Sequence, residues 1–181
     1  DQRRDALLAA ARLIIEANRI VTEEPGSQVG TVGRIQAEPG AVNVIPGKVV
    51  MSLELRDISM DKVRSLFSRI RAEGQRVERE TNTRISFTAI EETPPTATDA
   101  RLRDLIRESA AELGLSSLDL PSGAGHDGQS VARIAPIAMI FIPSVGGISH
   151  SPKEFSRPED IADGTRVLLR ALLKVDGARP E

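Results

Sequence analysis

Only two histidines occur in the chain, and both lie in glycine-containing loops beside apolar segments. His126 stands in the run from Ser122 to Gly128, and His150 stands in the run from Gly146 to Glu154. Proteins of the α/β class place their ligands in loops of this kind. Because an imidazole can bind a metal or transfer a proton near neutral pH, these two loops are the first candidates for chemistry.

Two acidic neighbours of the histidines also have structural explanations. Asp127 directly precedes a predicted short helix that begins at Gly128, so its side chain can cap that helix. Glu154 can bond backbone amides of its own loop. A histidine in a loop is by itself also compatible with no function. The local pattern therefore leaves structural and functional roles open in both loops.

Two further candidates come from the first half of the chain. Arg56 ends the polar face of a strictly alternating segment, where a guanidinium can bind a carboxylate through two parallel hydrogen bonds. The spacing alone favours a simpler explanation, a solvated ion pair of Arg56 with Glu54 or Asp57. Asn43 precedes the turn at 44–47, and an ordinary turn amide also accounts for it.

Composition excludes several kinds of site and partner. The 181 residues contain no cysteine, which removes disulfides, thiolate nucleophiles and cysteine-based zinc sites. Trp and Tyr are also absent and the net charge is −2, so we expect no nucleic-acid partner. No apolar run approaches the ~20 residues of a membrane span, so we expect no membrane partner. The chain shows no nucleophile elbow, P-loop or Rossmann glycine pattern.

The elements that position these residues fall into two halves, with a boundary at Thr93-Pro94-Pro95-Thr96. In the first half, periodicity predicts helices over 3–23 and 59–81, the second with Ser59 as its N-cap. Alternation predicts strands over 29–37, 49–55 and 85–89. This order lacks one strand of a ferredoxin-like fold, a four-stranded antiparallel sheet with two helices on one face. Residues 1–93 are expected to form that domain with its first strand missing.

The second half, residues 96–181, has an α/β pattern. Helices are predicted over 98–113, from 128 to about 134, and from Pro158 to about 175. The apolar run 137–142 suits a strand that is buried on both faces, as in a parallel sheet, and a polar loop follows over 143–157. One strand is too few for a complete sheet, so this half is expected to be part of an α/β domain.

Taken together, the motifs resemble the metal-dependent aminoacylase and M20 peptidase superfamily. The resemblance is closer to its hydantoinase/carbamoylase branch, which comprises N-carbamoyl-L-amino-acid hydrolases, allantoate amidohydrolases and β-ureidopropionases. The motifs occur in family-like order and cover nearly all of the chain: residues 3–6, 43–47, 55–57, 122–127 and 140–154. The Gly-Ala-Gly-His-Asp and Gly-Ile-Ser-His-Ser-Pro forms favour this branch over the peptidases.

The resemblance implies a catalytic domain that is interrupted by a lid and dimerisation domain. Residues 1–93 would be the lid, and residues 96–181 the C-terminal part of the catalytic domain. One metal ligand is implied, His150, which would bind one of two divalent ions (Zn²⁺, Mn²⁺, Co²⁺ or Ni²⁺). The implied substrate-binding residues are Asn43, Arg56 at the substrate carboxylate, Gly123 and Gly125 in the glycine loop, and the adjacent His126.

Several parts of the family pattern have no counterpart here. The first catalytic segment is missing, with its His-x-Asp pair, its general-base glutamate and a further histidine ligand. A lid histidine expected shortly before Asp1 is missing too. A catalytic zinc needs about three protein ligands, and this chain offers one. We therefore expect a piece of a longer enzyme that has no catalytic residue of its own, is inactive alone and leaves the metals unbound.

The implied reaction is the two-metal hydrolysis of a carbon–nitrogen bond other than a peptide bond. The expected substrate is a small carboxylate-bearing ureido molecule, either an N-carbamoyl amino acid or a ureido acid such as allantoate. The lid is expected to form a homodimer, and the location is expected to be cytoplasmic, since no signal-peptide pattern opens the chain. Two alternatives remain, an M20 aminoacylase or peptidase with the same metals, and a non-catalytic dimerisation module.

Overall fold

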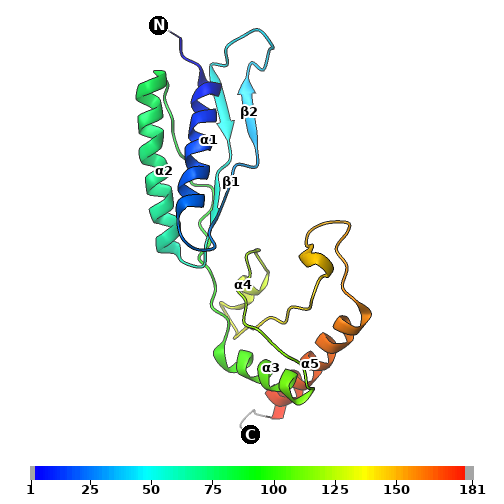
Figure 1. Cartoon of the computed structure of the whole chain (residues 1–181). Helices are drawn as coiled ribbons and strands as arrows, with labels where there is room; N and C mark the ends of the chain where they lie inside the picture. Colours follow the sequence, from blue (N-terminus) through cyan, green and yellow to red (C-terminus); the bar gives the residue numbers. More distant parts are fainter. Residues whose placement is uncertain (1–2, 178–181) are drawn as a thin grey trace. The chain divides into compact units, whose positions relative to one another are not determined.

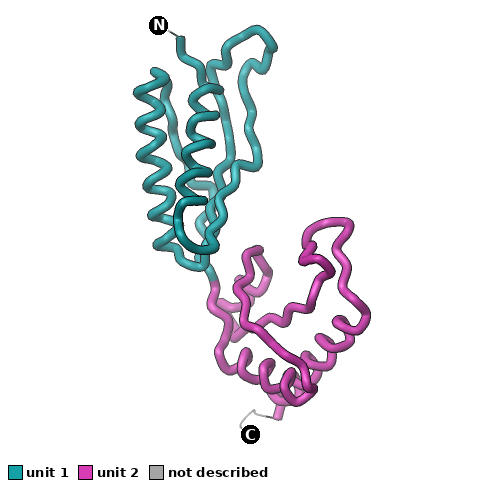
Figure 2. Tube along the Cα trace, in the orientation of Figure 1, with its two compact units in different colours: residues 1–95 teal, residues 96–181 magenta. Residues whose placement is uncertain are grey.

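The computed structural model describes residues 3–177 and divides into two compact units (Figure 2). Unit 1 ends at Pro95 and unit 2 begins at Thr96, directly after the proline pair that separates the two halves of the sequence. Within residues 3–177, no helix combines the length and the apolar character that crossing a membrane requires.

Unit 1 contains two long helices whose starts are fixed by side-chain caps. Helix α1 (Ala6–Glu23) follows Asp5, whose Oδ1 accepts the backbone N–H groups of Leu7 and Leu8 at 3.1 and 3.0 Å. The cap explains why α1 starts three residues later than the predicted 3–23, because a capping residue lies outside the helix. Helix α2 (Met60–Thr81) follows Ser59, whose Oγ accepts the Lys62 N–H at 3.4 Å and confirms the predicted N-cap.

The strands of unit 1 form two small antiparallel ladders. Strand β1 (Val29–Thr31) pairs with β4 (Glu54–Arg56), and β2 (Ile35–Glu38) pairs with β3 (Lys48–Met51). Each of the predicted strands 29–37 and 49–55 is therefore split in two. Ser52 bridges the split, because its N–H donates to the Arg34 carbonyl while its Oγ accepts the Arg34 N–H, both at 3.0 Å. The Ser52 hydroxyl thus takes the place of the backbone carbonyl that would accept the Arg34 N–H in a continuous ladder.

The predicted strand 85–89 does not form a strand and joins neither ladder in the part of the chain that the structure describes. Its alternation is nevertheless real, since Ile85 and Phe87 pack against the core. The ring of Phe87 lies edge-on to Phe67 of α2, with centroids 5.5 Å apart. The prediction of a strand is wrong here because a ladder needs a neighbouring strand, and none among residues 3–177 pairs with this segment.

The core of unit 1 lies where α1 and α2 pack together over the strands (Figure 1). The helical periodicity of α2 corresponds to one buried face, where Leu66, Ile70 and Val77 are fully buried. The two helices share one buried cluster, made of Leu13, Ala17, Ile20, Val21, Leu66 and Ile70. Side chains of the extended segments cover it, namely Met51, Leu53, Leu55, Ile85 and Phe87.

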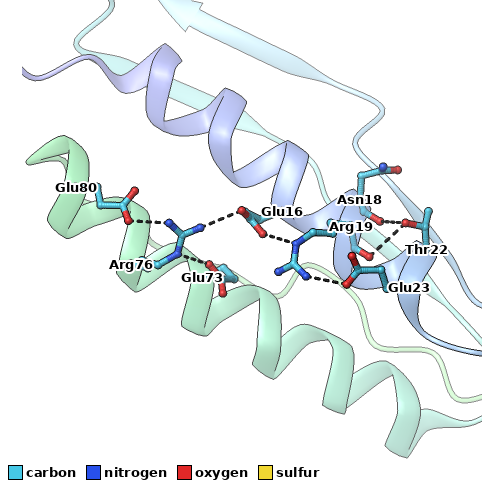
Figure 3. A network of polar contacts seen from close by, with 8 residues as sticks. All are labelled: Glu16, Asn18, Arg19, Thr22, Glu23, Glu73, Arg76 and Glu80. Carbon is cyan, nitrogen blue, oxygen red and sulfur yellow. Dashed lines mark hydrogen bonds and ion pairs between the residues drawn. The ribbon is translucent and has the colours of Figure 1, made fainter.

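A network of ion pairs joins the solvent-facing sides of the same two helices (Figure 3). Arg76 of α2 contacts Glu16 of α1 at 3.0 Å, and Glu73 and Glu80 of its own helix at 2.6 and 2.7 Å. Arg19 of α1 also contacts Glu16, at 2.9 Å. The hydrogen bonds that Arg76 donates to Glu73 and Glu80 raise its pKa. Because these groups are solvated, each pair adds little stability, and the network mainly orients the helix surfaces.

Unit 2 rests on the pairing of helix α3 (Ala100–Glu112) with helix α5 (Pro158–Gly177). α5 begins at Pro158, as predicted. Both helices bury small residues, and ion pairs link them at their solvent edge, where Glu112 contacts Arg170 at 2.6 Å and Lys174 at 2.7 Å. Helix α4 (Gly128–Val131) and the 3₁₀ turn η1 (Val145–Gly147) lie in the segments between α3 and α5.

The predicted buried strand 137–142 is not a strand in the described residues of unit 2. It runs against the helices instead. The Ile137 carbonyl accepts the N–H of Asp99 at 2.7 Å, and α5 approaches so closely that a Cβ on Gly164 would overlap Ile142 Cγ2. Ile142 is still 38% exposed. The prediction fails because burial on both faces requires flanking strands, and no other strand lies in the described part of this unit.

Candidate active site

His150 lies in a loop that the backbone closes at its base. The Val145 N–H donates to the Phe155 carbonyl at 2.8 Å, which joins the two ends of the loop. Inside it, the Ser144 hydroxyl donates to the Ile148 carbonyl at 2.5 Å. The turn also passes through Gly146 and Gly147, whose φ values of 69° and 67° favour glycine. These contacts hold a compact loop between the 137–142 segment and α5.

The backbone of His150 adopts an uncommon conformation within this loop. Its φ is 55°, in the left-handed region that residues with a Cβ rarely occupy. Its N–H donates to Glu154 Oε2 at 2.8 Å, which confirms that Glu154 bonds a backbone amide of its own loop. The imidazole is exposed, and its Nδ1 lies 3.2 Å from the Ser149 hydroxyl. With Nδ1 engaged, Nε2 is the ring nitrogen available to a ligand.

The glycine loop at 122–128 holds the second histidine. His126 Nδ1 accepts the backbone N–H of Gly128 at 2.9 Å. Because Nδ1 is the acceptor, a neutral ring carries its proton on Nε2, which can then donate to a ligand. Gly123 and Gly125 are exposed, and a Cβ on Gly123 would meet nothing within 4 Å. The imidazole of His126 is thus held in this loop by a bond of its own ring.

The predicted capping role of Asp127 is wrong. Asp127 precedes α4, but its side chain makes no cap hydrogen bond, and its φ of −57° and ψ of −22° are already helical. A capping side chain needs an extended backbone that turns it back toward the first turn. His126, one residue earlier, takes the first N–H of α4 instead.

The two histidine loops rise on the same side of the α3–α5 pair (Figure 1). Even so, no group of three or more His, Asp or Glu side chains within residues 3–177 could hold a metal ion. His150 suits a single ligand position, with an exposed ring and an engaged Nδ1. The described residues therefore do not complete a metal centre of the expected kind.

Arg56 forms the ion pair that its spacing favours. Its Nη2 donates to Glu54 Oε2 at 2.7 Å, and both side chains are about half exposed, at 50% and 56%. The pair lowers the pKa of Glu54 and raises that of Arg56, mainly through this hydrogen bond. Asp57 is engaged elsewhere, since its Oδ1 accepts the Ser59 N–H and its Oδ2 lies 3.5 Å from Lys62 Nζ.

Asn43 lies in the exposed turn between β2 and β3. This turn contacts the start of α1, where the Ala6 N–H donates to the Pro46 carbonyl at 3.1 Å. Arg56 lies at the other end of the paired strands, opposite Val29. Extended chain advances about 3.3 Å per residue, so the run from Lys48 to Arg56 spans on the order of 25 Å. Unit 1 therefore holds Asn43 and Arg56 far apart, which the sequence motifs did not reveal.

Ser149 is a candidate that the sequence analysis did not single out. Its hydroxyl contacts the His150 ring at Nδ1, the kind of neighbour that orients a histidine ligand. The hydroxyl directly before the histidine was the available clue. A serine in a loop is too common to be chosen on that basis alone.

Comparison with known proteins adds independent findings. The chain is 38% identical over 170 residues to an N-carbamoyl-L-amino acid amidohydrolase of Geobacillus stearothermophilus, which covers 94% of this chain and 41% of that protein. It is 38% identical over 175 residues to a ureidoglycolate hydrolase of Arabidopsis thaliana, covering 96% of this chain and 37% of that protein. The chain thus spans about two fifths of the length of these relatives.

A solved structure agrees with these relatives. An amidase of the hydantoinase/carbamoylase family from Burkholderia multivorans superposes with a TM-score of 0.84 and 35% identity, over 96% of this chain and 42% of that one. The sequence profile of peptidase family M20/M25/M40 matches residues 6–174. Because that match covers both units and both histidine loops, the chain belongs to peptidase family M20/M25/M40.

Proposed function

We propose that this chain is part of an amidohydrolase that cleaves carbon–nitrogen bonds other than peptide bonds in N-carbamoyl amino acids or ureido acids. The observation that carries the proposal is the 38% identity, over nearly the whole chain, to the N-carbamoyl-L-amino acid amidohydrolase. The two histidine loops support it, because each presents an exposed imidazole on an ordered turn.

Arg56 is assigned to the substrate carboxylate. A guanidinium offers several N–H donors in one plane and matches a carboxylate with two parallel bonds. The half-exposed side chain is accessible, and the bond to Glu54 gives it a defined orientation on the strand. A small acid would compete with Glu54 for the same planar donor group. This role fits a ureido acid, which carries a free carboxylate.

His126 is assigned to the polar end of the substrate, next to Gly123 and Gly125. Its Nδ1 is held by the Gly128 N–H, so Nε2–H is a donor of fixed tautomer. Such a donor suits a carbonyl oxygen of a carbamoyl or ureido group. The open space around Gly123 supports close approach of a ligand to the backbone.

His150 is assigned as one ligand of a divalent metal site, for Zn²⁺, Mn²⁺, Co²⁺ or Ni²⁺. Since the described residues supply no further converging ligands, the others and the general base would come from outside residues 3–177. We accordingly expect the 181-residue chain to be inactive alone. This expectation agrees with the fraction of its relatives that the chain spans.

Asn43 is assigned to the substrate as well, in a homodimer formed through unit 1. One small acid is too short to contact both Asn43 and Arg56 of the same chain, given the length of strand between them. Each site would then take Asn43 from one subunit and Arg56 from the other. Exposed strand edges of the two small ladders are available for pairing between copies.

The test uses a protein of the relatives' length that contains this chain, loaded with each metal in turn. Allantoate, N-carbamoyl-β-alanine, N-carbamoyl-L-amino acids, N-acetyl amino acids and dipeptides are assayed side by side. Release of ammonia from a carbamoyl or ureido acid is expected. Turnover of only N-acetyl amino acids or dipeptides would favour an aminoacylase or peptidase, and turnover of none would favour a non-catalytic dimerisation module.

The subunit arrangement has its own test. Asn43→Ala and Arg56→Ala variants, each inactive alone, are co-expressed and their mixed dimers purified. If each site takes Asn43 from one subunit and Arg56 from the other, a mixed dimer retains one intact site and recovers about half of the normal activity per dimer. If one subunit supplies both residues of a site, both sites of the mixed dimer carry a substitution and the mixed dimer is inactive. The opposite result is expected for wild-type/double-mutant dimers. The latter recover activity only when one subunit supplies both residues.

A further inference from the structure

The left-handed backbone of His150 needs support from its surroundings. A residue with a Cβ holds a φ of 55° only where neighbouring contacts fix it. The conformation matters because it sets the direction in which the imidazole leaves the chain. A contact that fixes the backbone of His150 is therefore expected in this loop.

Glu154 supplies contacts at both ends of the turn. Its carboxylate Oε2 accepts the His150 N–H at 2.8 Å, and its own N–H donates to the Ser151 carbonyl at 2.9 Å. The next residue, Phe155, closes the base of the loop through its carbonyl. Glu154 is thus anchored where the loop is closed and bonds back to His150. An ionised acceptor makes this bond stronger than a neutral one would be.

We propose that Glu154 is a positioning residue that fixes the backbone of His150 and thereby the direction of its imidazole. The inference rests on the proposed ligand role of His150. Glu154 acts through the His150 N–H and requires no contact with substrate or metal. A glutamine at this position would keep an acceptor oxygen at the same reach, whereas an alanine would remove it.

The first test uses the ¹⁵N-labelled 181-residue chain without metal. Glu154→Ala is expected to shift the His150 amide signal and to accelerate its exchange with solvent by about tenfold or more. Glu154→Gln is expected to keep most of the protection. Lys153→Ala changes a charge in the same turn but leaves the bond, so it serves as the matched control. Amide signals of α3 and α5 show whether each variant is folded.

Unchanged His150 shift and exchange in folded Glu154→Ala would overturn the inference. Equal losses of protection in Glu154→Gln and Glu154→Ala would overturn it too, because they would indicate that an acceptor oxygen at this reach does not hold the His150 N–H. If Glu154→Ala does not fold, Glu154→Met takes its place, because its side chain has a similar length and no oxygen acceptor and should lose the protection that Glu154→Gln keeps.

The second test uses the longer protein and measures bound metal rather than turnover. Glu154→Ala is expected to weaken metal affinity by about 10- to 100-fold, as loss of a supporting contact commonly does. Glu154→Gln should restore most of that loss. His150→Ala separates the two proposals. If it leaves metal content normal, the ligand role fails, whereas normal affinity in Glu154→Ala beside metal loss in His150→Ala rejects only the positioning role.

Discussion

The ring nitrogen Nδ1 of His126 accepts the backbone N–H of Gly128 at 2.9 Å, so the histidine itself closes the turn that starts α4. An asparagine side chain commonly makes the same bond to the amide two residues ahead. The contact fixes the tautomer of His126 and leaves Nε2–H as the outward donor.

We expect His126→Ala to loosen the start of α4. Loss of a side-chain cap should raise solvent exchange of the Gly128 amide by roughly 2- to 30-fold, measured by NMR. His126→Asn should keep the amide protected, because its side-chain oxygen can accept the same N–H. The same Asn variant should still lose substrate affinity in the longer protein, since it lacks the Nε2–H donor. Equal amide exchange in the wild type and His126→Ala would contradict the capping role.

Arg56→Lys tests the carboxylate assignment. Lysine keeps the charge but loses the planar fork, so kcat/KM for a ureido acid should fall by about 10- to 150-fold. The neutral amide analogue of the same substrate should be much less affected. Metal content should stay constant. Equal losses of kcat/KM for both substrates would instead indicate that Arg56 has a structural role, through its bond to Glu54.

Glu112 should make the stability of unit 2 depend on pH. Hydrogen bonds from Lys174 and Arg170 lower its pKa below the ordinary 4.5. A lowered pKa in the folded state contributes stability above the unfolded pKa, and this contribution is lost as the pH falls through the folded pKa. Urea unfolding followed by circular dichroism should therefore show less stability in acid.

The matched variants are Glu112→Gln and Glu108→Gln. The first should flatten the acid loss, because the amide does not titrate. The second should change it less, since Glu108 has a single contact of 3.2 Å to Lys174. An acid profile identical in the wild type and Glu112→Gln would reject this assignment.

Gly30 permits close packing of α1 on β1. An alanine Cβ there would lie 2.6 Å from Val21 Cγ2, closer than side chains can approach. Gly30→Ala should therefore lower the free energy of unfolding of unit 1 by about 1–3 kcal/mol in urea titrations. Gly47→Ala is the control, since its Cβ would meet nothing within 4 Å. Similar midpoints for the two variants would show that Val21 can move aside.

Features set by neighbouring residues in the sequence could be predicted well. The caps and helix starts at Ser59 and Pro158, and the buried stripe with Leu66 and Ile70, depend on residues within one or two turns. The Arg56–Glu54 pair is equally local, because residues two apart share a strand face.

Features that depend on distant neighbours could not be predicted from the same patterns. Alternation at 85–89 and apolar character at 137–142 indicate which side chains are inward, but a strand exists only where another strand lies beside it. The choice of His126 over Asp127 as the cap depends on the path of the loop. The separation of Asn43 from Arg56 depends on strand register, which their motifs do not contain.

The unpaired segment around Phe87 separates two properties that a β-strand usually combines. Its inner side chains are packed, with Phe87 against Phe67 and Gly74, whereas within residues 3–177 no strand covers its backbone. The Ile85 N–H is held by Glu78, but the following amides have no ladder to protect them. Deuterium should therefore enter the backbone here quickly while the aromatic ring stays rigid, so that backbone exchange alone would understate how ordered this part of unit 1 is.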